Sequence, residues 1–370
     1  MDTPTQARGT DTAADIRRID VTLPAHRYAV HIGPGARRLL PSAVAELGAR
    51  RLVVVTALPD AELPDPGVPF RVVAARDGER DKTLATVESY CRAFVEFGLT
   101  RSDAVVAIGG GTVTDTVGLA AALYHRGIPV IHLPTTLLAQ VDASVGGKTA
   151  VNLPEGKNLV GVYWQPAAVL CDTDYLATLP ARDMLSGYGE IARCAFIGAG
   201  DPRGLPLHEQ IAAGVALKAA VVAEDERDAS LRHILNYGHT LGHAIERATD
   251  YAWRHGEAVA AGTVFAGLLA GALGRVDRAR VALHRSVVAD FGLPTWLPSG
   301  VTGDTLVSLM RRDKKAQDTD AGLTFVLDGP AGAELVRDVP EPLVRSVLAA
   351  MPTGPEPTGA ARRDPARGAP

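Results

Sequence analysis

The stretch AVVAIGGGTVTDTVGLAAA, residues 104–122, constrains the fold more than any other part of the chain. A run of small and β-branched apolar residues meets three glycines, Gly109, Gly110 and Gly111, and a helical pattern begins directly after them. In a parallel α/β sheet, such a turn lets the backbone approach a pyrophosphate at the helix N-terminus. The triplet is not the GxGxxG fingerprint, and on spacing alone it is more often a tight turn. Asp115 favours the cofactor interpretation, as a contact to a nicotinamide ribose or amide.

The same alternation extends over the first half of the chain. Apolar runs predict strands at 51–55, 70–75, 104–108 and 129–133, and helical patterns are found at 42–49, 83–97 and 113–123. We therefore expect residues 18–178 to form a doubly wound, Rossmann-like α/β domain.

The second half has a different texture. Segments rich in Ala, Leu and Val show helical periodicity at 183–197, 208–225, 230–247, 255–273, 276–291 and 303–313. We expect residues 179–350 to form a mainly α-helical domain, with a short extended pair near 323–327 and 333–339. The polar leader, 1–17, and the Pro/Gly/Arg-rich tail, 351–370, are expected to be disordered.

Composition excludes several classes of protein. A chain of 370 residues with 46% hydrophobic content can bury two moderate cores, and a formal net charge of −4 argues against nucleic-acid binding. The cysteines Cys91, Cys171 and Cys194 lack the spacing of a disulfide framework or thiolate zinc site, which indicates a reducing cytoplasm. There is no secretory pattern at the N-terminus, and the run 258–274 is built of Ala and Gly, so we expect no membrane span.

The segment SLRHILNYGHTLGHAIE carries the strongest chemical signal. On one continuous helix, Arg232, Asn236, His239 and His243 would fall within an arc of roughly 60°. A buried polar face of this kind must find partners. Histidines at i and i+4 can share a metal, with His255 of RHGEAV as a third ligand.

A carboxylate would complete a three-ligand metal site with an open position. Glu190 in LSGYGEIARC and Glu257 in RHGEAV are both compatible with that role. Spacing does not decide between them, because Glu257 could equally accept a hydrogen bond from a ligand.

Lysines with short polar companions occur in three segments: GGKTAVN (Lys148, Asn152), EGKNLVG (Lys157, Asn158) and MRRDKKA (Lys314, Lys315). The first two are expected in the loop region after the 129–133 strand. Each fits an anion contact, and each is also compatible with ordinary surface lysine; Lys148, between glycines and Thr149, favours the anion contact most. Lys218 stands alone in an apolar helix, where a snorkelling side chain explains it adequately.

These segments resemble the dehydroquinate synthases and their sugar phosphate cyclase relatives. The similarity extends from about residue 77 to 348 and includes DGERDK, GGGTVTD, YHRGIPVIHLPTTLLAQVDASVGGKTAVN, GKNLVG, DTDYLATLP, LNYGHTLGHAIE, HGEAVAAG and RDKK. So many motifs in one order are highly specific to that family.

The resemblance implies a role for each matching residue. The metal, zinc or cobalt, would be held by Glu190, His239 and His255, with His243 beside it as a polar or acid–base group. The NAD site would be lined by Glu79, Lys82, Gly109, Gly110, Gly111, Asp115, Thr135, Thr136, Asp142, Lys148, Lys157 and Thr178. Substrate carboxylate would bind Lys218 and Arg232, and phosphate would bind Lys148, Asn158, Asn236 and Lys315. Arg126 would reach in from a partner subunit, which implies a homodimer.

The reaction of the family explains this mixture of groups. NAD+ oxidises a ring hydroxyl held on the metal, which acidifies a neighbouring C–H so that phosphate can leave. Hydride is then returned, and the ring opens and recloses by an aldol step. The net reaction is phosphate elimination.

Two departures from the family pattern stand out. Family members commonly show an acidic residue and an amide in the turn after the second strand. This chain has TALPD there, 56–60, which places the adenosine-side contact to NAD in question. Arg193 stands where a lysine is usual, at i+3 from Glu190, and is expected to reach the substrate pocket. Because of Arg193 and the short segment that follows it, the chain resembles the amino-sugar branch of the family. This branch is the aminodehydroquinate synthases, which serve aminohydroxybenzoate formation.

The first functional hypothesis is therefore conversion of an amino-substituted seven-carbon keto-acid sugar phosphate to aminodehydroquinate. The alternative within the family is 3-dehydroquinate synthase of the shikimate pathway. A metal-dependent polyol dehydrogenase would instead release NADH, and the phosphate-directed Lys148, Asn158 and Lys315 argue against it. A non-catalytic relic is disfavoured by the intact set Glu190, His239 and His255.

Overall fold

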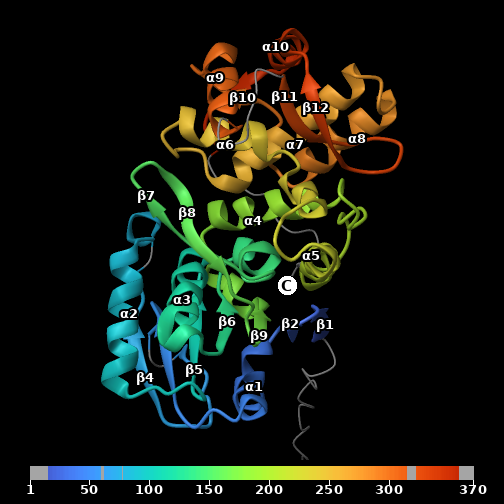
Figure 1. Ribbon diagram of the computed structural model, residues 1–370. Coiled ribbons are helices and arrows are strands. Elements are labelled where there is room, and N and C mark those ends of the chain that lie inside the picture. The colour runs from blue at the N-terminus through green and yellow to red at the C-terminus, as the bar shows by residue number, and fades with distance from the viewer. Residues whose placement is uncertain (1–15, 60–61, 77, 315–321, 358–370) are drawn as a thin grey trace, which may run out of the picture.

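The computed structural model describes residues 16–59, 62–76, 78–314 and 322–357. Figure 1 shows a lower part built on a sheet, blue to green, and an upper part, yellow to red, that is mainly helical. The expected fold class is confirmed, because a Rossmann-like parallel sheet is followed in the chain by helices.

The main sheet has seven strands in the order β1-β2-β9-β6-β5-β3-β4. The bounds are β1 (Arg17–Thr22), β2 (Arg27–Gly33), β3 (Leu52–Thr56), β4 (Phe70–Ala74), β5 (Ala104–Gly109), β6 (Val130–Pro134) and β9 (Ala168–Asp172). Only the pair β1–β2 is antiparallel within this sheet. Strands β3, β5, β6 and β9 are buried along their whole length, which is why they are apolar runs rather than alternating patterns. The four predicted strands are confirmed.

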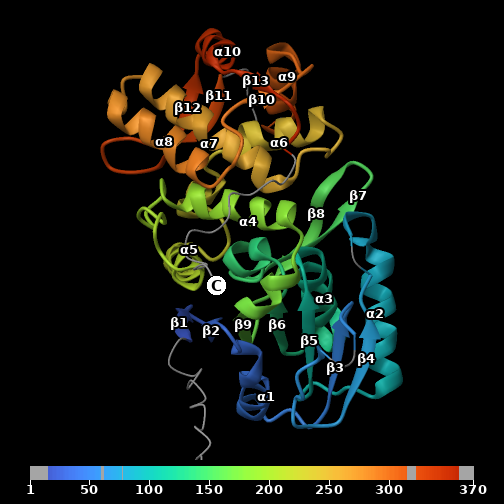
Figure 2. The ribbon, with the colours of Figure 1, turned by 180° about the vertical axis from the view of Figure 1, so that it is seen from behind.

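Helices cover both faces of the sheet. On one face, α1 (Leu40–Leu47) packs against the side chains of Val54 and Val106. On the other, α2 (Leu84–Phe97) and α3 (Gly111–Leu123) pack against Val53 and Val105. Since successive strand residues point to opposite faces, this arrangement is the doubly wound one that the sequence predicts. The reverse view in Figure 2 shows α2 and α3 lying along the same sheet.

The strands β7 (Lys148–Leu153) and β8 (Gly156–Tyr163) form an antiparallel hairpin that rises toward the helical part, as both ribbon views show. The expectation of a loop for these two lysine segments is wrong. Thr149 and Val151 are buried on alternate positions of β7, and Val151 joins the core beneath α3. That alternation is the strand signal, and the Gly, Lys and Asn residues around it obscure it.

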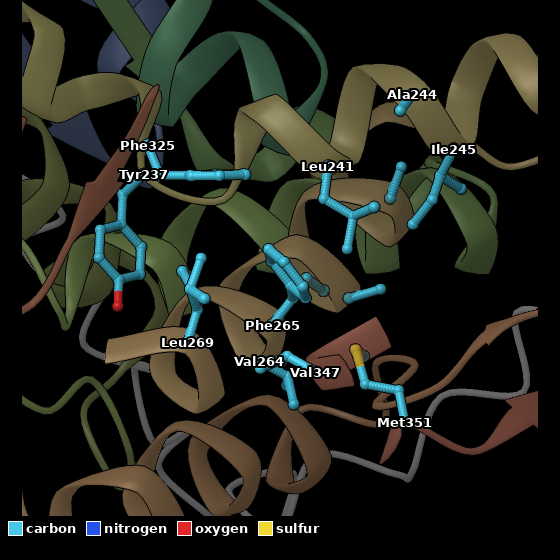
Figure 3. Packing of buried hydrophobic residues seen from close by; sticks show 14 of the residues in the cluster. Tyr237, Leu241, Ala244, Ile245, Val264, Phe265, Leu269, Phe325, Val347 and Met351 are labelled. Carbon is cyan, nitrogen blue, oxygen red and sulfur yellow. The ribbon is translucent and has the colours of Figure 1, made fainter. Parts of the chain in front are cut away.

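The helical part is built around α7. Its helices are α4 (Ala181–Cys194), α5 (Leu207–Glu224), α6 (His239–Ala248), α7 (His255–Ala272), α8 (Arg278–Asp290), α9 (Gly303–Lys314) and α10 (Glu341–Ala350). Helix α7 is buried over most of its length, so it needs no polar face. Figure 3 shows Phe265 of α7 between Leu241 of α6 and Val347 of α10, with Leu269 of α7 on the side of Tyr237.

The predicted helix over 230–247 is interrupted. A 3-10 helix (η8) covers Leu231–Asn236, and α6 begins at His239 after Gly238 in the left-handed region at φ 78°. Only glycine fits there, because a Cβ on Gly238 would lie 2.9 Å from the Val259 backbone of α7. Arg232 and Asn236 therefore do not share a helix face with His239 and His243.

The expected extended pair is confirmed as β11 (Leu323–Leu327) and β12 (Glu334–Val339), whereas α10 was not predicted. The fold continues past residue 350, because β13 (Thr353–Gly354) pairs with β10 (Leu297–Pro298) and Met351 is buried. The first strand, β1, starts at Arg17, which is the last residue of the expected leader. Residues 1–15 and 358–370 lie outside the described residues. Within the described chain, no helix has both the length and the apolar character of a membrane span.

Candidate active site

Three helices bring one carboxylate and two imidazoles together. Glu190 lies on α4, His239 is the first residue of α6, and His255 is the first residue of α7. The Oε1 atom of Glu190 lies 3.8 Å from His239 Nε2 and 3.4 Å from His255 Nε2. One ligand atom from each residue lies within 4.8 Å of the others, which is a spacing that a single divalent ion can bridge.

Glycines allow these helices to approach. A Cβ on Gly189 of α4 would lie 2.2 Å from the Gly256 carbonyl oxygen, and a Cβ on Gly256 would lie 1.7 Å from the Ser186 oxygen. On the other side of α7, a Cβ on Gly262 would lie 2.0 Å from the Gly238 oxygen. Because Gly189 precedes Glu190, Gly256 follows His255 and Gly238 precedes His239, the closest helix contacts lie beside the ligands themselves.

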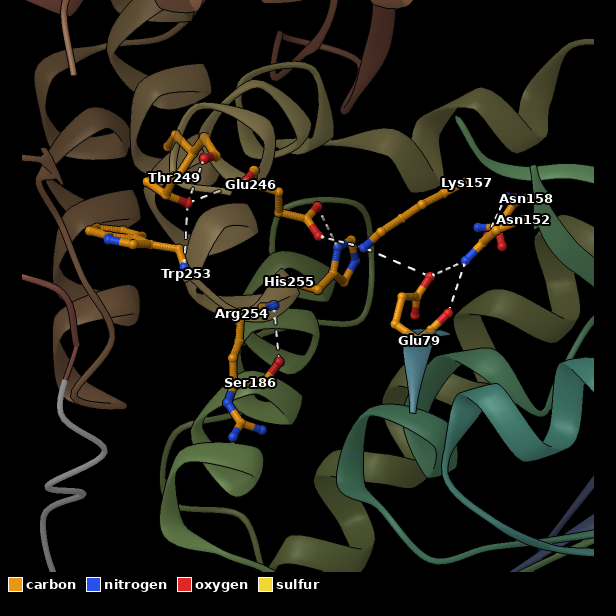
Figure 4. A network of polar contacts seen from close by, with 12 residues as sticks. Glu79, Asn152, Lys157, Asn158, Ser186, Glu246, Thr249, Trp253, Arg254 and His255 are labelled. Carbon is orange, nitrogen blue, oxygen red and sulfur yellow. Dashed lines mark hydrogen bonds and ion pairs between the residues drawn. The ribbon is translucent and has the colours of Figure 1, made fainter. Parts of the chain in front are cut away.

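The other ring nitrogens fix the orientation of both histidines. Assigned as donors, His239 Nδ1 bonds the Tyr237 carbonyl oxygen at 3.1 Å and His255 Nδ1 bonds Glu246 Oε2 at 3.1 Å. Both Nε2 atoms then keep lone pairs that face Glu190. Figure 4 shows the ring of His255 lying against the carboxylate of Glu246.

The charges in the site call for a cation. Glu190 Oε1 is buried and has no hydrogen-bond partner among the described residues. Burial lowers the pKa of His239 to about 3. Burial also opposes protonation of His255, but the nearby carboxylates of Glu190 and Glu246 raise its pKa to about 10. A divalent ion could occupy the position of that proton, so Glu190, His239 and His255 fit a metal site.

Glu257, the competing carboxylate, has a structural role instead. Its Oε2 accepts the backbone N–H of Arg254 at the start of α7, and both of its oxygens bind Arg182 at 2.8 Å. This saturated, buried carboxylate caps the helix that carries His255. It contributes no atom to the cluster of possible metal ligands.

His243 lies one helical turn after His239 but outside that three-residue cluster. Its ring centroid is 5.4 Å from that of His239, nearly edge-on, and 6.1 Å from that of His255. With Glu246 and His255 it forms a second close group of three possible ligands. The structure thus places His243 beside the candidate ligands. His239 and His243 do not share the first cluster, which consists of Glu190, His239 and His255.

Arg193 reaches Glu190 directly. Its Nε donates to Glu190 Oε2 at 2.6 Å, and both side chains are buried. Burial opposes ionisation of Glu190, but the guanidinium of Arg193 and the neighbouring imidazoles hold the pKa of the carboxyl well below its usual range. The Nη1 atom of Arg193 is buried without a hydrogen-bond partner in the described chain, so one strong donor remains available.

The glycine turn lies at the carboxyl ends of β5 and β6, where a doubly wound sheet binds its ligand. A Cβ on Gly109 would lie 2.6 Å from Val113 Cγ2, and one on Gly110 would lie 3.1 Å from Thr136 Cγ2. Helix α3 has no side chain capping its N-terminus, which leaves backbone N–H groups for an anion. Thr135 donates its N–H to the Gly109 oxygen at 2.9 Å.

Charged and polar groups adjoin this turn. Asp115 forms an ion pair with Lys82, whose Nζ also lies 2.6 Å from Asn158 Oδ1. Burial raises the pKa of Asp115 to about 6 although Lys82 opposes the shift. Thr178 lies exposed in the segment Thr173–Thr178, where its hydroxyl donates to the Tyr175 oxygen at 3.3 Å. The structure therefore brings Asn158, expected at the phosphate, into contact with the residues expected at NAD.

Lys218 is not a snorkelling lysine. Its buried Nζ bonds Asp142 Oδ1 at 2.6 Å and the Asp142 carbonyl oxygen at 2.7 Å. Arg232 is also buried, with its two Nη atoms on the carbonyl oxygens of Glu226 and Gly146 at 2.7 and 2.8 Å. A Cβ on Gly146 would meet both Arg232 and Lys218, so these two expected carboxylate ligands lie together.

The remaining expected phosphate ligands lie on separate elements. Lys148 Nζ pairs with Asp228 Oδ2 at 2.5 Å, and Asn236 is exposed at the end of η8. Lys315 lies outside the described residues. Arg126 is exposed at φ 65° in the turn after α3.

Sequence reasoning missed Glu246 as a group of the site. It lies seven residues after His239 and three after His243 on α6, so its helical spacing was a usable signal.

Comparisons with known proteins agree with one another over most of the chain. Residues 72–186 match the family described as 3-dehydroquinate synthase N-terminal, and residues 187–316 match the one described as 3-dehydroquinate synthase C-terminal. A protein of Amycolatopsis mediterranei provisionally named aminodehydroquinate synthase is 64% identical over 334 residues, covering 90% of this chain and 94% of that protein. A 3-dehydroquinate synthase of Pseudarthrobacter chlorophenolicus is 41% identical, covering 90% and 96%.

Among solved structures, 2-deoxy-scyllo-inosose synthase complexed with carbaglucose-6-phosphate, NAD+ and Co2+ is similar, with a TM-score of 0.81. It is 26% identical in sequence, and the alignment covers 90% of this chain and 99% of that one.

Proposed function

The chain belongs to the 3-dehydroquinate synthase family, and on that premise we propose that it is an NAD- and divalent-metal-dependent aminodehydroquinate synthase. It converts the amino-substituted seven-carbon keto-acid sugar phosphate to aminodehydroquinate and phosphate. The observation that carries the choice of branch is Arg193, buried on the metal-ligating carboxylate of Glu190. The 64% identity to a relative with this provisional name supports the same choice.

When bound, NAD+ supplies reversible oxidation of a ring hydroxyl and the metal supplies polarisation of that hydroxyl. Glu190, His239 and His255 hold the metal, and the turn Gly109–Gly111 with Asp115 and Lys82 holds the dinucleotide. Glu79, Thr135, Thr136, Asp142, Lys157 and Thr178 complete the proposed dinucleotide site.

The buried pair Lys218 and Arg232 binds the substrate carboxylate at the Gly146 turn. Two cations at one turn provide charge for that carboxylate, although each also holds backbone or side-chain oxygens of the protein. Retaining both cations favours a keto-acid substrate over a neutral sugar phosphate.

Lys148 and Asn158 of the hairpin, Asn236 and Lys315 are proposed to bind the leaving phosphate. The positive charge of the two lysines and the N–H groups of the two asparagines would stabilise the charge that develops on it. His243, beside the metal ligands, serves the proton transfers as a polar or acid–base group. Because phosphate leaves in the net reaction, these groups must bind it most strongly as its bond breaks.

Arg193 accounts for the substrate preference. Its Nε donates to Glu190, and its buried Nη1 has no other hydrogen-bond partner in the described chain. An N–H of Nη1 can therefore donate a hydrogen bond to the lone pair of a neutral amine on the substrate. A lysine has a compact ammonium and cannot make both contacts in the same planar geometry.

3-Dehydroquinate synthase activity is the second candidate. It is favoured by Lys218 and Arg232, which suit either keto-acid substrate, and by the 41% identical relative of that name. The substrates differ in one functional group, so direct competition separates the two candidates.

The deciding experiment measures phosphate release by the purified protein with NAD+ and zinc or cobalt. The amino and oxygen forms of the sugar phosphate are compared side by side, and absorbance at the NADH wavelength is followed in parallel. Faster release from the amino substrate supports the proposal. Equal or faster release from the oxygen substrate identifies a 3-dehydroquinate synthase, and accumulating NADH without phosphate release identifies a polyol dehydrogenase.

We also propose that the working form is a homodimer in the cytoplasm. Arg126 is exposed in the turn after α3, and the hairpin carries exposed apolar side chains, among them Leu159 with 59% of its surface exposed. A second copy covering these side chains would bury them and bring Arg126 to the partner's site. Sedimentation equilibrium tests this, and a monomer at the concentration of the activity assay contradicts it.

A further inference from the structure

Glu246 is a buried carboxylate to which the proposed reaction gives no role. It lies on α6 and touches one group from each half of the molecule, as Figure 4 shows. Its Oε2 accepts from His255 Nδ1 at 3.1 Å, and its Oε1 lies 3.6 Å from Lys157 Nζ on the hairpin strand β8. Glu246 therefore joins a metal ligand to an element of the dinucleotide-binding part.

The contact to His255 selects one form of that imidazole. With its proton held on Nδ1, His255 presents the Nε2 lone pair toward Glu190. An anionic acceptor on Nδ1 also makes Nε2 a stronger electron donor, and such carboxylate–imidazole pairs commonly increase metal affinity.

The contact to Lys157 extends the chain of polar groups into the other half. The ammonium of Lys157 lies 4.0 Å from the ring centroid of Tyr251 and 3.9 Å from Glu79 Oε1. That oxygen of Glu79 also accepts from Asn152 Nδ2 at 2.7 Å, and Asn152 Oδ1 accepts the Asn158 N–H at 2.9 Å.

From Asn158 the chain reaches the glycine turn. Asn158 Oδ1 accepts from Lys82, which pairs with Asp115 in the first turns of α3. A continuous series of polar contacts thus connects the segment proposed to hold the dinucleotide with the proposed metal ligand His255.

We propose that Glu246 is a positioning residue for His255, and that Lys157 couples metal binding to dinucleotide binding through it. The coupling rests on the proposed function, which supplies the dinucleotide. The metal and the dinucleotide would each order the contact between Lys157 of the hairpin and Glu246 of α6. Whichever binds second would then lose less conformational entropy. The two ligands consequently strengthen one another.

The positioning role is tested by titrating metal-free protein with Co2+ and following its visible absorption, a measurement that needs no turnover. Glu246→Gln keeps the size of the side chain and loses its charge, and is expected to weaken Co2+ binding about ten- to hundredfold. Glu155→Gln, an exposed charge change at the turn of the same hairpin, is the matched control and should leave affinity unchanged.

Glu246→Asp provides a second variant, because it keeps the charge but shortens the reach to His255. Weaker Co2+ binding by both variants, with melting temperatures close to that of the wild type, supports positioning. Wild-type Co2+ affinity in a folded Glu246→Gln protein overturns it.

The coupling is tested by repeating the Co2+ titration with saturating NAD+, with saturation checked separately by calorimetry. NAD+ should tighten Co2+ binding about fivefold or more in the wild type. The same comparison in Lys157→Met should show little or no tightening even where NAD+ is saturating. Equal tightening in both proteins overturns the role of Lys157.

The outcomes separate this inference from the proposed function. A wild-type protein that binds Co2+ but not NAD+ contradicts the proposed function and removes the coupling with it. A protein that binds both ligands and releases phosphate, yet shows no change of Co2+ affinity with NAD+, overturns the coupling alone.

Discussion

The side chain of Arg193 both holds the carboxylate of Glu190 and keeps one donor without a hydrogen-bond partner in the described chain. Its Nε holds the Oε2 atom of Glu190 at 2.6 Å, which leaves Oε1 for the metal, and its Nη1 remains without a partner in the described chain. In the proposed site, a change of the residue at this position would therefore alter both the metal ligand Glu190 and the contact to the substrate.

Arg193→Lys should shift preference toward the oxygen substrate. A charged hydrogen bond contributes about 1.5–3 kcal/mol, so the ratio of kcat/KM for amino to oxygen substrate should fall roughly ten- to hundredfold. Steady-state phosphate release with each substrate measures the ratio. An unchanged ratio would mean that Arg193 does not discriminate between them.

His239→Ala should abolish activity by removing a metal ligand. Two remaining ligands, Glu190 and His255, form an incomplete site, so phosphate release should fall to background and metal should be lost on dialysis. Elemental analysis of the dialysed protein checks the cause. His208→Ala, a histidine of α5 outside the metal cluster, should retain both metal and activity. Full activity of either protein after exhaustive metal removal would contradict the mechanism.

At the scale of helices, the site depends on close backbone approach. Gly189 and Gly256 allow α4 and α7 to meet beside Glu190 and His255, and Gly238 and Gly262 do the same for α6 and α7. Each of these contacts is with backbone atoms, which cannot rotate away as a side chain can. The positions of the ligands are therefore set by helix packing.

Gly189→Ala should separate α4 from α7, because the added Cβ would lie 2.2 Å from the Gly256 oxygen. Overpacking of this kind costs about 1–3 kcal/mol, so the melting temperature should fall and metal affinity should weaken. Gly303→Ala, at the open start of α9 with nothing within 4 Å of its Cβ, is the control and should be neutral or slightly stabilising. If Gly189→Ala has the wild-type melting temperature and metal affinity, helix approach does not set the site.

The buried strands of the sheet could be predicted from the sequence, whereas the break at Gly238 and the hairpin β7–β8 could not. Uniformly apolar runs such as LVVVT in β3 identify buried parallel strands well, since no other segment of that length needs apolar side chains on both faces. Periodicity failed at Gly238, because the break there comes from the backbone of α7, which is distant in sequence. The hairpin β7–β8 was missed because its lysines and asparagines suggested a loop.

The candidate site likewise contains residues that the sequence could identify and residues whose roles needed the structure. The histidines and Glu190 could be named as candidates from residue type and spacing, whereas Glu257 could not be excluded until its contacts with Arg182 and the start of α7 were visible. The role of Lys218 was underestimated for a similar reason, since its partner Asp142 lies on another element.

For the molecule as a whole, two buried histidines link stability to pH. His132 lies in β6 of the sheet and His284 in α8 of the helical part, where its Nε2 bonds the Tyr237 hydroxyl at 2.7 Å. Burial lowers the pKa of each to about 4 from the usual 6.5. Both are neutral in the folded protein at neutral pH, and the unfolded chain binds their protons more readily.

Stability should therefore be complete above about pH 6.5 and decline as the pH falls toward 4. Each histidine should contribute a loss of about 2 kcal/mol in the free energy of unfolding between pH 7 and pH 5. Urea unfolding at both values measures the loss, and His284→Gln, which can still bond Tyr237, should reduce it. A loss of the same size in His284→Gln would show that His284 does not contribute.

The glycine contacts also bear on transplanting this metal site into another protein. Copying Glu190, His239 and His255 onto three helices of a new scaffold would reproduce the chemistry of the ligands but not their spacing. Ordinary helices pack with axes 8–10 Å apart, and side chains at their contacts would hold the new ligands away from one another. A designer would have to carry over Gly189, Gly256, Gly238 and Gly262 as well, so the smallest portable unit of this site is a set of helix contacts.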